Sequence, residues 1–250
     1  MNDLSGKRAL VTGGGTGVGA VIAKMLADQG ARVWISGRRA APLEAIASQN
    51  PHIRMVVGDV TQPQDCKAMI DAAADPDIVV ANAGTSMSKP FHKMTPEDVQ
   101  AMMSVNLFGV FNIFSAALSP MKSKGAGRLI SVASTAGLKG YAYVSAYCAA
   151  KHAVIGLTRS LALELAETDI TVNTVCPGFT ETPMLRASIE NIMVKTGRAQ
   201  IEAERALSAA NPQGRFVQPA EVADTVLWLA GSGAGAITGQ SISISGGEVM

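Results

Sequence analysis

The sequence predicts an α/β fold in which a doubly wound parallel sheet of about seven strands carries helices on both faces. Two observations predict it. Short β-branched runs alternate with longer amphipathic segments, and each connection is long enough to hold a crossover helix. The chain has 250 residues, enough for one large core. No stretch has the composition of a linker, so we expect a single domain over residues 1–250.

Each expected element is defined by such a run. The strands cover residues 9–12, 32–36, 53–57, 77–80, 128–132, 170–175 and 241–244. A glycine-led helix ends near Gly30, a favourable residue just beyond a helix C-terminus. Further helices are expected over residues 42–48, 63–73, 96–114, about 144–167 and 218–230. In such sheets ligands bind outside the carboxyl ends of the strands, so motifs that follow the strands are the candidates for function.

Composition excludes several classes of protein. A formal net charge of +1 provides no electrostatic footprint for nucleic acid or for an anionic membrane. The cysteines Cys66, Cys148 and Cys176 are isolated and lack the spacing of metal ligands, so we expect no metal site and a reduced compartment. The beginning of the chain is polar and no apolar run approaches ~18 residues. We therefore expect a cytoplasmic protein without a membrane segment.

The first strand runs directly into a glycine-rich turn, TGGGTGVG, which opens a helix. Glycines let a backbone approach a phosphate closely, and a helix N-terminus offers free N–H groups and partial positive charge. A strand before the turn and a helix after it are the context that favours dinucleotide binding over a merely flexible loop. The candidate cofactor-binding residues here are Thr12, Gly13, Gly15, Thr16, Gly17, Val18 and Gly19.

The candidate chemistry lies in the segment STAGLKGYAYVSAYCAAK, residues 134–151. If the chain is helical from about Val144, Tyr147 and Lys151 lie one turn apart on one face. An ammonium ~4 Å away at an effective dielectric of ~20 stabilises a phenolate by ~4 kcal/mol before desolvation, so we expect Tyr147 to exchange a proton near neutral pH. Ser134 is expected to direct its hydroxyl at the same oxygen. The alternative is an ordinary pair on a helix surface.

Six motifs occur along essentially the whole chain in one order. They are TGxxxGxG at 12–19, NAG at 82–84, Asn106, Ser134, Tyr147-xxx-Lys151 and Pro177-Gly178. In this order and spacing the chain resembles the classical short-chain dehydrogenases/reductases. The resemblance implies a Rossmann-type fold and an NAD(P)-dependent oxidoreductase that interconverts a ketone and a secondary alcohol. The chain looks most like the 3-oxoacyl thioester reductase branch, whose substrates are carried by coenzyme A or acyl carrier protein. Related members act on cyclic, sugar or other small secondary alcohols.

The resemblance also implies a role for each candidate catalytic residue. Tyr147 would be the general acid/base, and Lys151 would lower the pKa of the phenol and hold the nicotinamide ribose. Ser134 would orient the carbonyl group, and Asn106 would support a water that leads protons away from Lys151. The hydride belongs to the cofactor, and the protein supplies position and electrostatics. A non-catalytic dinucleotide-binding protein is the less favoured alternative.

Further cofactor contacts follow from the resemblance, position by position. Asp59 would meet the adenine amino group with Val60 beside it, although a plain turn aspartate is an alternative for Asp59. Residues after the fourth strand would line the adenosine ribose, and residues after the sixth strand would bind the nicotinamide end. These two sets are Asn82, Ala83 and Gly84, and Pro177, Gly178, Thr180 and Thr182.

The end of the second strand bears on the choice between NADP and NAD. An acidic residue at this place binds the ribose 2′-hydroxyl and selects NAD. Here the sequence is Ser36-Gly37-Arg38-Arg39, with glycine in place of the acid and two guanidiniums suited to a phosphate. We therefore expect NADP to be favoured over NAD. A solvated arginine pair is the alternative, and an arginine stacked on adenine would also tolerate NAD.

The substrate side of the site is predicted in outline. Residues 183–214 form an amphipathic insertion that we expect to act as a lid over the nicotinamide end. The expected substrate-binding residues are Ser134, Leu138, Tyr141, Val144, Tyr147 and Met184. Lys195, Arg198 and Arg205 could meet the phosphates of an acyl carrier, although a solvated helix face is the favoured explanation for them.

Two helices are more apolar than one sheet face requires. The segments 98–117 and 144–167 carry small and apolar residues on several faces, so part of each surface is expected to pack against another subunit. The resemblance implies a homotetramer with two-fold symmetry built on these helices and on the last strand. The expected ligand is a small ketone or alcohol.

Overall fold

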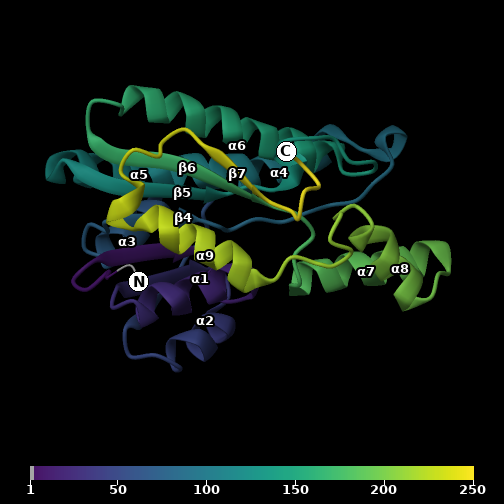
Figure 1. Ribbon diagram of the computed structural model, residues 1–250, viewed down its shortest axis with the longest axis horizontal. Helices are drawn as coiled ribbons and strands as arrows, with labels where there is room; N and C mark the ends of the chain where they lie inside the picture. The colour runs from purple at the N-terminus through teal and green to yellow at the C-terminus, as the bar shows by residue number, and fades with distance from the viewer. Residues whose placement is uncertain (1–2) are drawn as a thin grey trace.

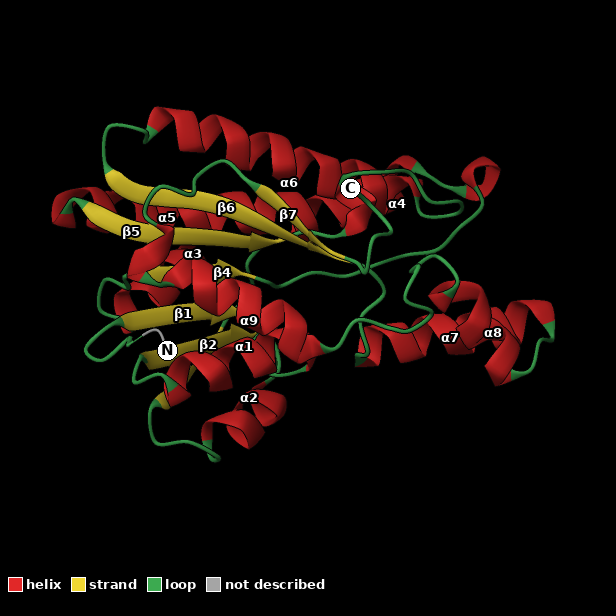
Figure 2. Ribbon diagram, viewed as in Figure 1, coloured by secondary structure: helices red, strands yellow, loops and turns green. Residues whose placement is uncertain are grey.

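A computed structural model describes residues 3–250 of the chain. Its centre is a parallel sheet of seven strands in the order β3-β2-β1-β4-β5-β6-β7 (Figures 1 and 2). This confirms the predicted fold class and each predicted strand. The strands are β1 (Arg8–Thr12), β2 (Arg32–Gly37), β3 (Ile53–Val57), β4 (Ile78–Ala81), β5 (Ala126–Val132), β6 (Asp169–Pro177) and β7 (Ser241–Ile244).

Helices cover both faces of the sheet, because the central strands carry apolar side chains on both sides. On one face lie α1 (Gly17–Asp28), α2 (Ala40–Ala47) and α9 (Pro219–Ala230), which contribute to one buried core (Figure 1). On the other face lie α3 (Pro63–Ala72), α5 (Gly109–Lys124) and α6 (Ser145–Glu164), which contribute to a second core. Leu10 and Val11, neighbours on β1, belong to different cores, as the alternation of side chains along a strand requires.

The predicted helix over residues 96–114 is wrong in both its continuity and its end. The structure has α4 (Pro96–Met103), a π-helical turn η2 (Ser104–Phe108) and then α5, which continues to Lys124. The stop signal is Gly125, whose φ of 75° is the left-handed conformation that favours glycine beyond a helix end. Smaller differences are that α6 ends at Glu164 and that α2 begins at Ala40. A propensity argument places helix ends only to within a residue or two.

The helical stretch from Pro96 to Lys124 also corrects the expectation that no apolar segment is long enough to cross a membrane. By length and composition it could do so, and less than half of its most apolar window is buried within the chain. One such helix is weak evidence, because a core helix of a globular protein passes the same test. Here Val110, Ile113 and Phe114 are buried against the sheet.

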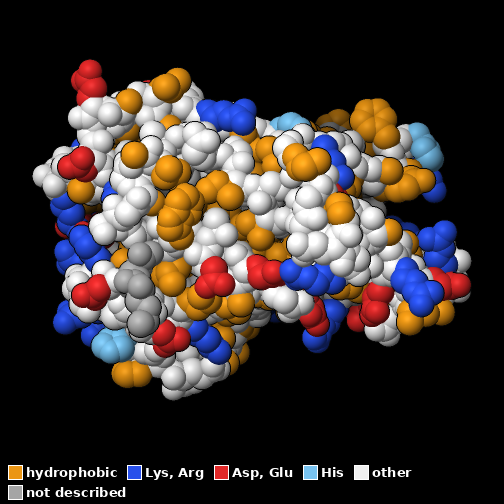
Figure 3. Space-filling model, in the orientation of Figure 1, with side chains coloured by type: hydrophobic (Ala, Val, Ile, Leu, Met, Phe, Trp, Pro, Cys, Tyr) orange, Lys and Arg blue, Asp and Glu red, His pale blue; other side chains and the backbone are white. Residues whose placement is uncertain are grey.

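Two helices stand apart from the layered body. After β6, α7 (Pro183–Thr196) and α8 (Gln200–Ser208) project beyond the carboxyl ends of the strands (Figures 1 and 2). They share a small core of Leu185, Ile189 and Ala203, and the face drawn in Figure 3 shows side chains of both charge signs over this region. The predicted amphipathic insertion is therefore a pair of helices with its own apolar contact.

Candidate functional site

The site lies where the carboxyl ends of four strands meet. The order of the strands reverses between β1 and β4, and β5 and β6 continue on the far side of β4. Thr12, Ala81, Val132 and Pro177 are the last residues of these four strands, so the loops that follow them are neighbours. Ligands of doubly wound sheets bind at such a reversal point. The glycine-rich turn, the NAG motif, Ser134 and Pro177-Gly178 lie at or just beyond these strand ends.

The glycine-rich turn fits an anion such as the diphosphate of a dinucleotide. Helix α1 begins at Gly17, and its N-cap residue Thr16 makes no side-chain hydrogen bond to the helix. The first turn of α1 contains no acidic residue, so its N–H groups and its positive dipole end are available to a phosphate. Gly19 has a packing role, since a Cβ there would lie 2.4 Å from Asn82 Nδ2.

Thr12 and Asn82 join the loops after β1 and β4. Thr12 Oγ1 accepts hydrogen bonds from the backbone N–H groups of Asn82 and Ala83, at 3.0 and 3.1 Å. Asn82 Nδ2 donates to the carbonyl oxygens of Thr12 and Gly13. These bonds hold the NAG motif against the glycine-rich turn, and its contact with the ribose stays a prediction.

The predicted adenine end of the site is open to solvent. Arg38 and Arg39 are exposed, and Arg38 Nη1 lies 4.0 Å from Asp59 Oδ2 across the ends of β2 and β3. Asp59 Oδ1 accepts from the N–H of Thr61, as a turn aspartate does, while Val60 is buried. The structure thus brings Arg38 and Asp59 together and leaves most of the guanidinium free for a further partner, since 72% of the Arg38 side chain is exposed.

The predicted catalytic groups converge near the first turns of α6. Tyr147 lies in the first turn, and Lys151 Nζ lies 5.7 Å from the centre of the Tyr147 ring. Lys151 is buried and donates to the carbonyl oxygen of Val132, the last residue of β5, at 2.9 Å. Ser134 is the N-cap of a short 3-10 turn, η3 (Thr135–Gly137), and lies close enough to Tyr147 for its hydroxyl to lower the pKa of the phenol.

The electrostatics differ from the expectation. Burial raises the pKa of Tyr147 to about 12, and the hydrogen bond from Ser134 offsets this only in part. Burial lowers the pKa of Lys151 to about 8. Desolvation is the largest influence on the phenol here, and the Lys151 ammonium is directed at the Val132 carbonyl, so the expected lowering of the phenol's pKa by Lys151 stays a prediction. At neutral pH Tyr147 keeps its proton and Lys151 is mainly an ammonium.

Asn106 is fully buried in the π-helical turn, a helix irregularity that often occurs at functional sites. Its Oδ1 accepts from the N–H of Thr85, and its Nδ2 donates to the carbonyl oxygens of Thr85 and Met102. A Cβ on Gly84 would lie 2.9 Å from Asn106 Oδ1 and 3.6 Å from Lys151 Nζ. The structure therefore brings Asn106, Gly84 and Lys151 together, and the water relay stays a prediction.

The loop after β6 is held by its own threonines. Thr180 Oγ1 donates to the carbonyl oxygen of Gly178, and Thr182 Oγ1 accepts from the N–H of Leu185 as the N-cap of α7. A Cβ on Gly17 would lie 3.4 Å from Thr182 Cγ2, so the beginnings of α1 and α7 are close neighbours. Pro177 ends β6 beside Ile244 of β7. These positions allow the predicted contacts with the nicotinamide end through the backbone.

The four remaining predicted substrate residues are placed differently from one another. Leu138 packs partly buried against the core, and Val144 is the N-cap residue of α6. Met184 is 43% exposed in the first turn of α7. The Tyr141 hydroxyl is engaged by Thr135 Oγ1 and Glu248 Oε1 and so is not free for substrate. Sequence reasoning missed Glu248, because no local pattern distinguishes it from an exposed acid.

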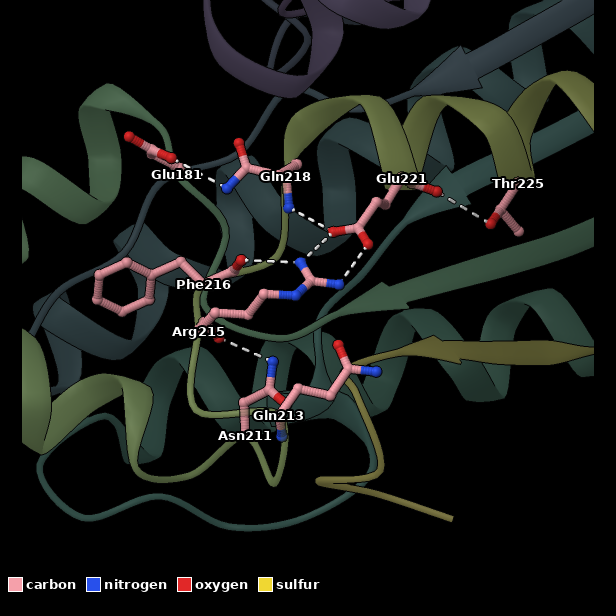
Figure 4. Close-up of polar contacts among 8 residues, drawn as sticks. All are labelled: Glu181, Asn211, Gln213, Arg215, Phe216, Gln218, Glu221 and Thr225. Atoms are coloured by element: carbon pink, nitrogen blue, oxygen red, sulfur yellow. Dashed lines mark hydrogen bonds and ion pairs between the residues drawn. The ribbon is translucent and has the colours of Figure 1, made fainter.

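A separate polar cluster ties the far end of the α7–α8 segment to α9 (Figure 4). Arg215 donates from both terminal nitrogens to the carboxylate of Glu221, at 2.8 and 2.6 Å, and Glu221 also accepts from the N–H of Gln218. A hollow of about 400 Å³ lies beside this pair, lined by Glu181, Ile201, Arg205 and others. None of the predicted catalytic residues lines it.

The comparisons with known proteins agree on the family. A family model described as short chain dehydrogenase matches residues 7–192. The chain is 38% identical over 244 residues to acetoacetyl-CoA reductase of Rhizobium meliloti, covering 96% of this chain and 97% of the relative. It is 36% identical over 253 residues to the 3-oxoacyl-acyl-carrier-protein reductase of Vibrio cholerae, covering 99% of each.

Solved structures show the same architecture. A variant of actinorhodin polyketide ketoreductase, determined with NADPH, superimposes with a TM-score of 0.92 at 35% identity and covers 96% of both chains. Levodione reductase superimposes with a TM-score of 0.91 at 29% identity and covers 98% of both chains. The whole described chain, including α7 and α8, therefore falls within one known architecture.

Proposed function

Because this chain belongs to the short-chain dehydrogenase/reductase family, an NAD(P)-dependent oxidoreductase family, we propose that it is an NADP(H)-dependent reductase of 3-oxoacyl thioesters. The relatives named above support the substrate class, since one reduces acetoacetyl-CoA and another a 3-oxoacyl group on acyl carrier protein, according to their names. A cyclic ketone is the second candidate, because levodione reductase aligns over 98% of both chains.

The observation that carries the proposal is the grouping of a phenol, a serine hydroxyl and a buried lysine at the carboxyl edge of the sheet. Ser134 orients the carbonyl oxygen of the substrate by a hydrogen bond. Tyr147 Oη gives its proton to that oxygen as negative charge develops there. An alkoxide is a much stronger base than a phenolate, so a phenol with a pKa of about 12 still transfers its proton downhill.

Lys151 contributes a positive charge next to the phenolate that remains after this transfer. With a pKa of about 8, it is mainly protonated at neutral pH and stabilises the anion. Asn106 holds the loop at Thr85 through two hydrogen bonds and keeps the space beside Gly84 defined. When bound, the nicotinamide cofactor supplies the hydride.

For the cofactor, NADP is favoured by charge. Arg38 and Arg39 are exposed where β2 ends, and Gly37 stands at the place where an acid would select NAD. The ketoreductase neighbour is described with NADPH. Comparing kcat/KM for NADPH and NADH tests this point. Arg38→Ala should lower kcat/KM for NADPH by about tenfold or more while leaving NADH nearly unchanged. A strong preference of the wild type for NADH would contradict it.

For the substrate, a panel with NADPH decides between the two candidates. Acetoacetyl-CoA, a cyclic diketone and a sugar ketone are offered at equal concentration, and consumption of NADPH is followed by absorbance. We expect the thioester to have the highest kcat/KM, because two of the relatives are, by their names, reductases of such thioesters. A higher value for the cyclic ketone would favour the second candidate. No turnover with any ketone would favour a non-catalytic dinucleotide-binding protein.

The α7–α8 segment is proposed as the lid of this site. A separate proposal is that the chain is one subunit of a cytoplasmic homotetramer. Phe108 and Phe111 are about half exposed at the start of α5, and Leu163 on α6 is 80% exposed. Such apolar surface on two neighbouring helices suits burial against other subunits. Light scattering coupled to size exclusion should report four chains, and Phe111→Glu should lower that number. A monomer in the wild type would contradict the assembly.

A further inference from the structure

A carboxylate is buried beside the candidate substrate site. The side chain of Glu248, in the segment that follows β7, is only 1% exposed. Acidic side chains are rarely so buried unless they are paired and hydrogen-bonded. The assigned functions of the site residues do not account for it.

Two glycines allow this placement. Gly246 and Gly247 have φ values of 62° and 94°, in the region that favours glycine, and they turn the chain back after β7. The N–H of Glu248 donates to the carbonyl oxygen of Ser245 within this turn. A Cβ on Gly246 would lie 2.1 Å from Asn211 Oδ1, so no other residue fits there without movement. The turn directs Glu248 towards Gly178, where a Cβ would lie 3.0 Å from Glu248 Oε2.

The partners of Glu248 stand on the loop between Ser134 and Tyr147. Glu248 Oε1 accepts a hydrogen bond from the Tyr141 hydroxyl and lies 3.0 Å from Lys139 Nζ. The same hydroxyl lies 2.6 Å from Oγ1 of Thr135, the residue that follows Ser134. Burial and then Glu248 raise the pKa of Tyr141 well above its usual range, so this phenol remains a neutral donor.

The Tyr141 ring extends the contact to the loop after β6. It meets the Phe179 ring edge to face, with ring centres 6.0 Å apart. Lys139 Nζ lies 4.9 Å from the centre of the Tyr141 ring. Three chain segments therefore meet at one carboxylate: the loop at 135–144, the loop after β6 and the segment after β7. Tyr147 and Lys151 stand instead on α6, which the sheet and the core hold in place.

We propose that Glu248 is a positioning residue of the substrate site, which fixes the 135–144 loop, and with it the wall that receives the ketone, by holding Tyr141 and Lys139. This inference rests on the proposed ketone reductase function. Because Glu248 acts through the loop and not on the proton donor, its loss should raise the substrate KM and leave kcat and the NADPH KM little changed.

The test compares Glu248→Ala, Glu248→Gln and Tyr141→Phe with a matched control, Asp224→Asn. Asp224 is exposed on α9, and the control also removes one carboxylate charge. With acetoacetyl-CoA and NADPH we expect the KM for the thioester to rise about tenfold in Glu248→Ala, with kcat within about threefold of wild type. Glu248→Gln keeps an acceptor for Tyr141 but loses the charge, so a rise of about threefold is expected. Asp224→Asn should match wild type.

A double variant shows whether the two side chains act together. Glu248→Ala and Tyr141→Phe remove the same hydrogen bond, so the combined variant should raise KM no more than the larger single effect. Multiplying effects would overturn the proposal, as would a parallel rise in the NADPH KM. If Glu248→Ala does not fold, the Gln and Phe variants carry the same test.

Hydrogen exchange of the ligand-free protein separates this proposal from the proposed function. Amides of residues 135–144 should exchange faster in Glu248→Ala than in wild type or Asp224→Asn, with α6 unchanged. Unchanged exchange in that loop would overturn the positioning role even if the ketone is reduced. Faster exchange with no ketone turnover in the wild type would support the positioning role and reject the proposed function alone.

Discussion

The first turns of α6, which carry Tyr147 and Lys151, and the projecting α7–α8 pair are stabilised in different ways. Lys151 and Asn106 are buried and hydrogen-bonded to backbone groups of β5 and of the loop after β4. The α7–α8 pair has a core of three buried residues and an exposed ion pair near its end. Under the proposed function, proton transfer therefore takes place beside the large core, whereas the proposed lid depends on a small core of its own.

The largest expected effect is on kcat and concerns Tyr147 on α6. Tyr147→Phe removes the proton donor and leaves the ring in place, so kcat should fall by about 10²–10⁴ with little change in substrate KM. Initial rates of NADPH consumption measure this, and the melting temperature serves as a folding control. Retention of wild-type activity would exclude Tyr147 as the proton donor. The comparison of the α6 site with the α7–α8 pair would then no longer concern catalysis.

The second effect concerns the contribution of Lys151 to the free energy of unfolding. The ordinary pKa of a lysine is 10.5, and burial lowers that of Lys151 to about 8. Between these pH values the unfolded chain binds more protons at this residue, so the contribution of Lys151 to the stability of the wild type should rise with pH. Below pH 8 the buried ammonium lowers the free energy of unfolding by up to about 3 kcal/mol.

Lys151→Met should relieve that cost and abolish the rise. Urea unfolding at pH 7 and at pH 10 should therefore show the difference between variant and wild type shifting by about 1–3 kcal/mol in favour of wild type at the higher pH. A difference that does not depend on pH would contradict the assigned direction of the Lys151 pKa.

Smaller effects are expected in the α7–α8 pair. Met184→Ala truncates an exposed side chain in the first turn of α7. If α7 contacts the substrate, the KM for acetoacetyl-CoA should rise about two- to fivefold with kcat unchanged, because only binding contact is lost. Val194→Ala, an 85% exposed position later on α7, is the matched control. Equal behaviour of the two variants would remove Met184 from the substrate site.

The smallest effect is expected at the ion pair that closes the α7–α8 segment. The guanidinium of Arg215 lowers the pKa of Glu221 to about 2 from its ordinary 4.5. The stabilisation is fully present above pH 4.5 and is lost as the pH falls through 2. Because both side chains are well exposed, Glu221→Gln should lower Tm at pH 7 by only about 1–2 °C, and by less at pH 3. A larger loss at pH 3 than at pH 7 would contradict this sign.

Much of this molecule follows from the sequence alone. The alternation of β-branched runs and amphipathic segments determined the parallel sheet, since side-chain periodicity depends only on local order. The glycine turn before α1 and the Tyr147-Lys151 spacing likewise predict where the chemistry would lie. Helix ends were less certain, and residues 104–108 form a π-helical turn in which Asn106 is bonded to Thr85, a contact that no local pattern contains.

Only the tertiary structure decided the electrostatics and the distant contacts. The pKa of Tyr147 is raised by desolvation, and desolvation depends on which segments surround α6 in three dimensions. Glu248 is 107 residues from Tyr141 along the chain, yet the two are hydrogen-bonded. Spacing along a chain specifies which groups share a helix face or a strand end. Desolvation and long-range pairing depend on what surrounds a group in three dimensions, and these effects determine how the site behaves.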